Sequence, residues 1–440
     1  MKKLTTSLLI VAACAAAAML TSCSKDESAA IEYKQPECLA KYNDYLYGLE
    51  YDDYDFKACT ELLEERYGSI APAACSEVRK GNFVGRNLDW YINRDLSAVI
   101  RINAKGTPSD DNFYTARYAS IGMVGCMPEF GIDYVKSTTE YLPVYELLPM
   151  STGDGINENG VYVGVNVTAT GETSMDPAKW KDHQWGLGAA YTNPTSDKKL
   201  CVTSLVRVIL DHATSVDDAI RIVNSINWYE PINFPIPGAT QAFHWLICDK
   251  NTSCVLEFVD NTPVFVKTTN VNTPSLATIM TNFNNYLMQD GIIQDHGIGY
   301  ERWDLLHDSY VYAPETAEGM QGLMEKVWYT KSYTMSIDEP GYWATENPNP
   351  YFTAPQMYKH PEILQDERYK QVVDYNVADY NNRDSWHTLD CTVWYTTHTS
   401  IYDLTTRSLS VKLHEGLDGM KEYMTFNFEQ HFPKPLNKKE

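Results

Sequence analysis

The chain has 440 residues, of which 44% are hydrophobic and 21% are charged, a composition typical of a globular protein with a large buried core. Its 58 acidic residues outnumber its 36 basic residues and give a formal net charge of -22. This balance argues against a nucleic-acid partner, because phosphates need a basic surface, and against electrostatic adsorption to anionic lipid.

The first residues, 1–22, are predicted to form a targeting sequence rather than part of the fold. Two lysines precede an apolar segment, Leu8 to Leu20, that is too short to span a bilayer stably. The segment ends in Leu20-Thr21-Ser22-Cys23, which resembles the lipobox of bacterial lipoproteins. The resemblance implies cleavage before Cys23 and acylation of its thiol. The alternative is a plain signal peptide in which this cysteine is incidental. The lipobox predicts a bacterial outer membrane lipoprotein, periplasmic or surface-exposed, that contacts the membrane through Cys23.

Residues 23–74 are interpreted as a lipid-anchored tether and pro-segment. Residues 24–35 are small and polar, which is typical of a tether. Residues 36–69 carry helical periodicity, with one apolar face made by Phe56, Cys59, Leu62, Leu63 and Tyr67.

The stretch from Ala74 to Trp90 is predicted to form a β-hairpin that turns at Lys80-Gly81-Asn82. Cys75 opens its first strand, and the return strand brings Arg86 and Asp89 back toward that cysteine. A thiol, a guanidinium and a carboxylate are therefore expected to meet at one end of a short ribbon.

These three groups suggest a nucleophile that is unmasked by cleavage between Ala74 and Cys75. The cut would give Cys75 a free α-amine, whose reference pKa of about 7.7–8.0 suits a general base for a thiol of pKa about 8.5. Arg86 would favour the thiolate, and Asp89 would hold and orient the ammonium. The alternatives are an ordinary buried thiol and a structural ion pair between Arg86 and Asp89.

The rest of the chain alternates between β-rich and helical stretches. The patterns predict strands from residue 75 to about 167 with a turn over 154–160, helices within 201–227, strands within 242–283, and helices over 300–307 and 317–328. Residues 331–385 are interpreted as a long insertion, and a final hairpin is expected within 391–413. This order predicts an α+β layered fold with one catalytic domain, residues 75–440.

The cysteines and histidines do not indicate a metal site. Neither a C-x-x-C pair nor an H-E-x-x-H motif occurs, so no cofactor is expected. Cys248 and Cys254 flank a turn and could face each other across a hairpin. After cleavage, a disulfide from Cys38 or Cys59 could hold the pro-segment. Docking without a disulfide and release of the enzyme are the alternatives.

Several motifs in one order resemble choloylglycine hydrolase-like enzymes, the linear amide C-N hydrolases of the N-terminal-nucleophile class. That family includes bile salt hydrolases, penicillin V acylases and relatives of acid ceramidase. The motifs are Cys75 with Gly85-Arg86-Asn87-Leu88-Asp89, Asn157-Glu158-Asn159-Gly160 with Val165-Asn166, His244 with Asp249 and Glu257, Thr281-Asn282, Gly299-Tyr300-Glu301-Arg302, and Val393-Trp394 to Tyr402-Asp403-Leu404.

The resemblance implies a four-layer αββα sandwich and a set of site residues. It implies Cys75 as nucleophile and base, with Asn166 and Asn282 as oxyanion-hole donors. Arg86, Asp89 and Arg302 would complete the polar site. The alternatives are turn formation at strand ends for the two asparagines and a solvated helix position for Arg302. His244 and Glu257 are expected to be structural rather than catalytic.

The implied activity is hydrolysis of a small-molecule N-acyl amide, either a conjugated bile acid or a fatty N-acyl amide, after autocatalytic cleavage at Ala74-Cys75. One alternative is a penicillin V or N-acyl-homoserine-lactone acylase. Another, from a different class, is a non-catalytic surface lipoprotein that binds glycans through its aromatic residues. A homo-oligomer is compatible with the sequence.

Overall fold

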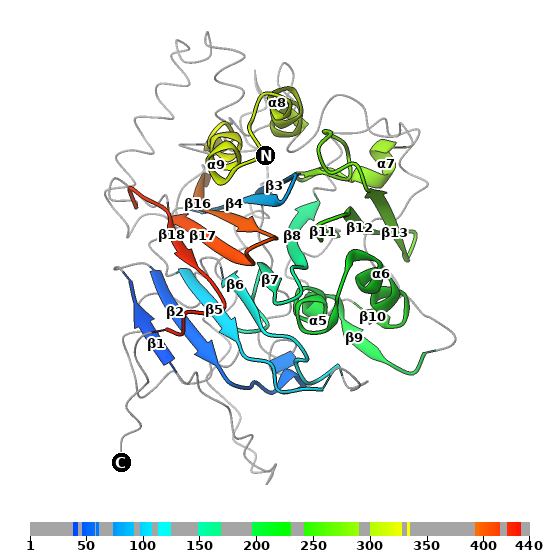
Figure 1. Ribbon diagram of the computed structural model, residues 1–440. Coiled ribbons are helices and arrows are strands. Elements are labelled where there is room, and N and C mark those ends of the chain that lie inside the picture. Colours follow the sequence, from blue (N-terminus) through cyan, green and yellow to red (C-terminus); the bar gives the residue numbers. More distant parts are fainter. Residues whose placement is uncertain are drawn as a thin grey trace, which may run out of the picture.

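The computed structural model describes residues 38–42, 46–57, 59–60, 74–91, 97–107, 113–124, 148–168, 196–229, 242–289, 300–327, 332–334, 392–413 and 420–432. These residues form two large β-sheets, a small two-stranded sheet and helices on two sides (Figure 1). The predicted targeting sequence, Cys23, residues 61–73 and most of the predicted insertion 331–385 lie outside the described residues. Within the described part, no helix is long and apolar enough to cross a bilayer.

The first sheet has nine strands in the order β1-β2-β5-β6-β7-β8-β11-β12-β13. Its strands β2 and β5 pair in parallel, whereas the other neighbours pair antiparallel. Their bounds are β1 (Cys38–Lys41), β2 (Leu46–Tyr51), β5 (Ser97–Ile102), β6 (Ser120–Val124), β7 (Asp154–Asn157), β8 (Tyr162–Thr168), β11 (Ala242–Cys248), β12 (Ser253–Val259) and β13 (Thr262–Thr268).

The second sheet has seven strands in the order β14-β3-β4-β16-β17-β18, with β15 paired to β16. Their bounds are β14 (Ile279–Met280), β3 (Ala74–Lys80), β4 (Phe83–Tyr91), β16 (Thr392–Asp403), β17 (Ser408–Leu413), β18 (Met424–Phe426) and β15 (Ser332–Thr334). A separate parallel pair joins β9 (Lys199–Cys201) to β10 (Asn227–Tyr229).

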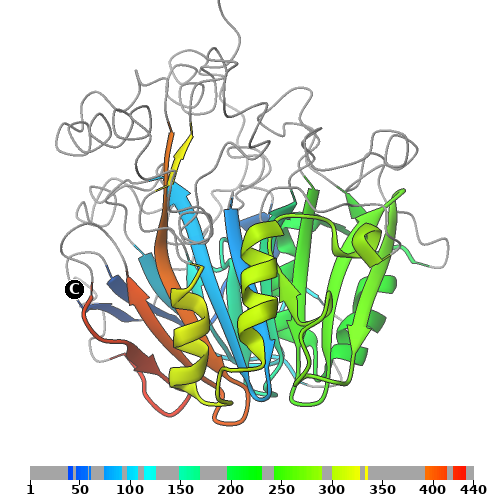
Figure 2. The ribbon, with the colours of Figure 1, turned by 90° about the horizontal axis from the view of Figure 1, so that it is seen from above.

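Helices cover the outer face of each sheet (Figures 1 and 2). On the first sheet lie α5 (Leu205–His212) and α6 (Val216–Asn224), and α7 (Asn285–Gln289) lies near β12 and β13. The second sheet is covered by α8 (Tyr300–Tyr310) and α9 (Ala317–Glu325). The Ser215 side chain accepts a hydrogen bond from the Asp218 amide and caps α6, as its sequence predicts.

Side chains of alternating direction along the strands build three apolar layers. Val163 packs with Leu205 and Ile209 of α5 in the outer layer of the first sheet. Its neighbour Tyr162 faces the other way and packs with Tyr402 between the two sheets. A third layer lies under α8 and α9 and contains Val78, Ile279, Ile401, Leu306 and Leu323. The order helix, sheet, sheet, helix confirms the predicted α+β fold with four αββα layers.

Three local predictions were wrong. Residues 38–41 and 46–51 form β1 and β2 rather than a helix, because β2 finds a distant parallel partner in β5. Residues 154–157 form β7 rather than a turn, which the chain makes only afterwards at 158–160. Cys248 and Cys254 are both free, because Cys248 is opposite Ser253 in the hairpin register and Cys254 is opposite Ile247.

Candidate active site

The hairpin of β3 and β4 has the register that its sequence predicts. Lys80 pairs with Phe83, so Gly81 and Asn82 make the turn, and Cys75 pairs with Leu88. Gly81 adopts a φ of +55°, a conformation that glycine reaches without strain. A Cβ atom on Gly81 would also collide with the Glu315 side chain. The turn therefore fixes which residues of β4 lie beside Cys75.

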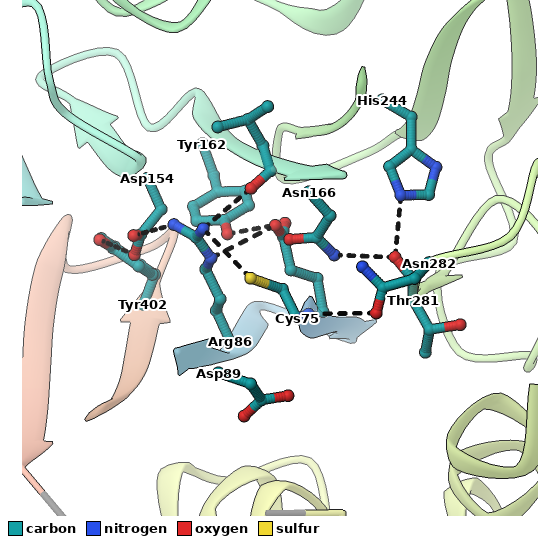
Figure 3. Close-up of polar contacts among 12 residues, drawn as sticks. Cys75, Arg86, Asp89, Asp154, Tyr162, Asn166, His244, Thr281, Asn282 and Tyr402 are labelled. Carbon is teal, nitrogen blue, oxygen red and sulfur yellow. Dashed lines mark hydrogen bonds and ion pairs between the residues drawn. The ribbon is translucent and has the colours of Figure 1, made fainter. Parts of the chain in front are cut away.

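Each polar group of Cys75 has a partner among the predicted site residues, and Figure 3 shows the partners of its amide and its thiol. Its amide N–H donates to Asn282 Oδ1 over 3.1 Å, and its carbonyl oxygen accepts from Arg302 Nη1 over 2.7 Å. Arg86 Nη2 lies 3.8 Å from the Cys75 Sγ atom. The amide and the thiol are both groups that the proposed chemistry would change, and both are held by buried side chains.

The thiol is fully buried, and burial raises the pKa of Cys75 to about 12. Arg86 acts in the opposite direction, as expected from the sequence, but in the uncut chain burial has the larger effect. The thiol of the uncut chain is therefore protonated at neutral pH.

Arg86 is itself held between the two sheets by a polar cluster that the sequence did not reveal. Its guanidinium pairs with Asp154 Oδ1 and donates to the Val165 carbonyl over 2.8 Å. Glu77 Oε1 lies 3.5 Å from Arg86 Nε. Two tyrosines complete the cluster, because Tyr402 donates to Asp154 over 2.6 Å and Tyr162 donates to Glu77 over 2.9 Å.

The two carboxyl groups of this cluster come from different sheets, Glu77 from β3 and Asp154 from β7. Burial raises the pKa of Glu77 to about 8, an effect that Arg86 opposes and Asp154 reinforces. A Cβ atom on Gly164 would lie 2.5 Å from Glu77 Oε2, so the close approach requires glycine at this position. Only the contact between two sheets assembles these groups, which is why no local pattern indicated them.

Asp89 lies three residues after Arg86 and is connected to Cys75 through Arg302. Its Oδ2 accepts from Arg302 Nη1 over 3.1 Å, and its Oδ1 accepts from the Thr396 hydroxyl over 2.6 Å. Arg302 also donates to Asn282 Oδ1. Burial raises the pKa of Asp89 to about 6, although Arg302 opposes the shift. Arg302 is thus a buried bridge between Asp89, Asn282 and the Cys75 carbonyl, not a solvated helix residue.

Asn166 and Asn282 are both buried at the same end of the site. Asn166 Nδ2 donates to the Thr281 carbonyl over 3.2 Å, and its Oδ1 has no hydrogen-bond partner among the described residues. An amide nitrogen carries two protons, so Asn166 keeps one for a further acceptor. The structure therefore brings together Cys75, Arg86, Asn282 and Arg302. Asp89 joins this set through Arg302, and Asn166 contacts the carbonyl of Thr281, the residue before Asn282.

His244 and Glu257 support the strand end that carries Asn282. The two ring nitrogens of His244 lie 3.0 Å from Glu257 Oε1 and 2.8 Å from the Thr281 carbonyl oxygen. Glu257 also accepts from the amides of Asn285 and Tyr286, at the start of α7. Asp249 accepts from the Val216 amide at the start of α6. These residues position backbone, and none of their hydrogen bonds within the described part of the chain reaches Cys75, which agrees with a structural role.

The arrangement has the parts of a nucleophilic site: a thiol, a guanidinium beside it and amide donors nearby. No group of three or more His, Cys, Asp or Glu residues that could hold a metal ion occurs in the described part of the chain.

Comparison with known proteins gives one family and a set of distant structures. Residues 187–303 match the family of linear amide C-N hydrolases, choloylglycine hydrolase family. No curated protein sequence is significantly similar to the chain. A penicillin V acylase from Agrobacterium tumefaciens is 13% identical, with a TM-score of 0.42 over 81% of this chain and 86% of that one. A mutant conjugated bile acid hydrolase from Clostridium perfringens is 14% identical, with a TM-score of 0.39 over 82% and 95% of the two chains.

The matched residues include α5, α6, the hairpin of His244 and Glu257, and the Thr281–Asn282 segment, and they end just after Arg302. Over residues 187–303 the chain thus matches the choloylglycine hydrolase family of linear amide C-N hydrolases, which confirms the predicted resemblance for the motifs of His244, Asn282 and Arg302 that lie within this range.

Proposed function

We propose that the protein hydrolyses the carbon-nitrogen bond of linear N-acyl amides with Cys75 as an N-terminal nucleophile. The observation that carries the proposal is the set of contacts around one residue: Arg86 beside the Cys75 thiol, Asn282 on its amide and Arg302 on its carbonyl oxygen. A structural cysteine needs none of these, whereas a cysteine that must become a positioned N-terminus needs all three.

The first step of the proposal is cleavage between Ala74 and Cys75. The Cys75 sulfur attacks the Ala74 carbonyl carbon, the peptide C–N bond breaks, and the thiol proton passes to the departing nitrogen, which becomes the α-amine. Water then hydrolyses the Ala74 thioester, which returns the thiol and leaves Ala74 with a carboxylate. Asn282, which accepts a hydrogen bond from the amide in the uncut chain, is placed to hold the new amine afterwards.

The cut would also change the electrostatics of the thiol. In the uncut chain burial raises the pKa of Cys75 to about 12. An α-ammonium on the same residue adds a positive charge next to the sulfur, and a nearby positive charge favours the thiolate. Arg86 supplies a second positive charge from the other side. The site would thus be inactive toward substrates before cleavage and active after it.

In the hydrolytic cycle the α-amine takes the thiol proton while the sulfur attacks the substrate carbonyl. The resulting oxyanion would accept hydrogen bonds from the side-chain amides of Asn166 and Asn282. The amine then returns the proton to the leaving nitrogen, and water hydrolyses the thioester to release the acid. Asp89 acts through Arg302, which holds the carbonyl of Cys75. Burial of the whole set excludes competing water until substrate binds.

The substrate class is proposed to be amides with an apolar acyl group, namely conjugated bile acids or fatty N-acyl amides. Penicillin V and N-acyl-homoserine lactones are the alternatives within the same chemistry. The location proposed is the bacterial outer membrane, with a lipid on Cys23.

The test combines N-terminal sequencing with hydrolysis of a panel of these four amide types. The proposal expects a chain that begins at Cys75, and loss of both cleavage and hydrolysis in Cys75→Ala. Cys254→Ala is the matched control, because Cys254 is also a free buried cysteine but belongs to β12. Full hydrolysis by the Cys75→Ala protein, or an active protein without a chain starting at Cys75, would refute the proposal. Sugar binding that is indifferent to Cys75 would instead favour the glycan-binding alternative.

A further inference from the structure

We propose that the N-terminal segment stays bound after cleavage as a non-covalent second subunit, and that it thereby keeps the catalytic chain attached to its lipid anchor. This inference rests on the proposed cleavage at Ala74-Cys75. The two chains would be the segment that ends at Ala74 and the chain that begins at Cys75. The contacts that would hold them together are made by residues 38–60, the part of the segment that the structure describes.

Residues 46–51 are built into the first sheet rather than attached to its surface. The strand β2 pairs with β5 along its full length, from Leu46 opposite Ser97 to Tyr51 opposite Ile102. All six residues of β2 are buried. On its other side β2 pairs with β1, which also comes from the segment. Removal of the segment would therefore leave β5 as an open sheet edge, with unpaired backbone groups and newly exposed apolar side chains.

A buried polar cluster joins the segment to two separate parts of the catalytic chain. Glu50 lies 3.5 Å from Arg101 of β5 and accepts a hydrogen bond from the Phe432 amide over 3.0 Å. Asn103 donates to Glu50 over 3.0 Å. Arg101 in turn donates to backbone carbonyls in the 427–430 stretch. Glu50 and Arg101 are both buried, with 3% and 5% of their surface exposed. Loss of the segment would therefore remove a buried carboxylate partner from Arg101.

Aromatic residues of the segment extend the same interface into the core. Tyr51, Tyr54 and Phe56 are buried in the layer that contains α5 and α6. The Tyr54 hydroxyl donates to the buried Asp211 of α5. Nearer the start of the segment, Tyr42 packs edge to face against Phe426 of β18, with ring centroids 5.1 Å apart. The segment thus contributes to two different layers of the sandwich, which a removable tether would not do.

No covalent bond is needed for this association. Cys59, one of the two cysteines proposed for a disulfide to the catalytic chain, is buried in the apolar layer. Strand pairing, the Glu50 cluster and the aromatic contacts are all insensitive to reductant. The association is therefore expected to survive a reducing buffer and to fail in a denaturant.

The experiment uses the full chain with a C-terminal affinity tag, expressed with its own N-terminus and captured in reducing buffer without denaturant. We expect two chains on a denaturing gel in equal molar amounts, with the N-terminal chain released from the resin only by denaturant. In cells, the chain that begins at Cys75 should fractionate with the membrane. Cys23→Ser should release both chains together.

Glu50→Ala tests the interface directly. It removes hydrogen bonds to a charged group, so the N-terminal chain should be lost from the captured complex about 10–100-fold more readily on dilution. Lys57→Ala, at an exposed position of the same segment, is the matched control and should leave retention unchanged.

The possible failures are distinguishable on the gel. A cleaved protein that is captured without its N-terminal chain would overturn this inference and leave the proposed catalysis intact. A protein that is active but never cleaved would overturn the proposed function and this inference with it. Retention of the N-terminal chain is measured first on the unmodified protein, so this part of the test does not depend on the folding of any variant.

Discussion

Replacing Asp154 with asparagine should destabilise the fold far more than replacing Glu77 with glutamine, although both carboxyl groups contact Arg86. Asp154 is the partner that pairs directly with the guanidinium and also accepts from Tyr402. Arg86 is 1% exposed, so its charge would remain buried with a weakened counter-charge. Removing one partner of a buried ion pair costs about 3–5 kcal/mol of unfolding free energy.

Glu77→Gln should cost only about 1 kcal/mol below about pH 4.5, the scale of one net hydrogen bond, and less than that at pH 7. With a pKa of about 8, the Glu77 side chain is mostly neutral at that pH, and glutamine has the same shape and charge. In the double variant neither carboxylate can balance Arg86. The combined loss should therefore exceed the sum of the two single losses.

The dependence of the unfolding free energy on pH provides a second test of the role of Glu77. The folded pKa of Glu77 lies above its ordinary value of 4.5, so the folded protein holds this proton more tightly than the unfolded chain does. That contribution to stability is complete below about pH 4.5 and is lost as the pH rises through about 8. Glu77→Gln cannot lose the proton, so the stability of the parent relative to this variant should fall across that window.

The assay is urea unfolding in the Cys75→Ala background, where cleavage cannot split the signal. Asp217→Asn is the control, because Asp217 is 75% exposed and pairs with Lys267 at the surface. Its loss should cost at most about 1 kcal/mol. The reasoning would be refuted if Asp154→Asn cost no more than this control, or if the Glu77 and Asp154 variants were equally destabilised at pH 7.

Three further predictions concern the site itself. Asn166→Ala should lower kcat about 10²–10³-fold with little change in KM, because it removes one donor to the oxyanion; steady-state kinetics with an unchanged kcat would contradict that role. Activity should rise with pH through about 6 as Asp89 ionises and pairs fully with Arg302. The pH profile of the Asp89→Asn variant should lack this rise, and a rise that is retained in the variant would assign it to another group. His244→Gln should cost about 1–3 kcal/mol in unfolding free energy and also lower kcat, because the support of the Thr281 carbonyl beside Asn282 is lost; a loss of stability at unaltered kcat would show that Asn282 does not depend on it.

The local parts of the site were predictable from sequence because one hairpin contains them. Gly81 and Asn82 fix the turn, and the turn fixes the register that places Arg86 and Asp89 near Cys75. The positions of Asn166, Asn282 and Arg302 came from the resemblance to a family and not from any periodicity. Such residues lie at the ends of separate elements, and no local rule states that those ends meet.

The parts that could not be predicted depend on contacts between distant segments. Asp154 and Glu77 meet only because the two sheets face each other, and each looks like an ordinary strand or turn residue in the sequence. The strand β2 was mistaken for part of a helix because its partner β5 begins 51 positions further along, at Ser97 opposite Leu46. In each case the tertiary partner overrode the local pattern.

The parallel pairing of β2 with β5 also bears on how the protein can fold. Parallel neighbours need a connection that crosses from the end of one strand to the start of the next, and here the β3–β4 hairpin of the other sheet lies within that connection. In the uncut chain this connection sets which strands meet and in which register. If the proposed cleavage between Ala74 and Cys75 cuts this connection, β2 must find β5 as a separate molecule. The mature enzyme would then retain a fold that its two chains cannot easily recover after complete unfolding, so its persistence would depend on the rate of unfolding more than on an equilibrium.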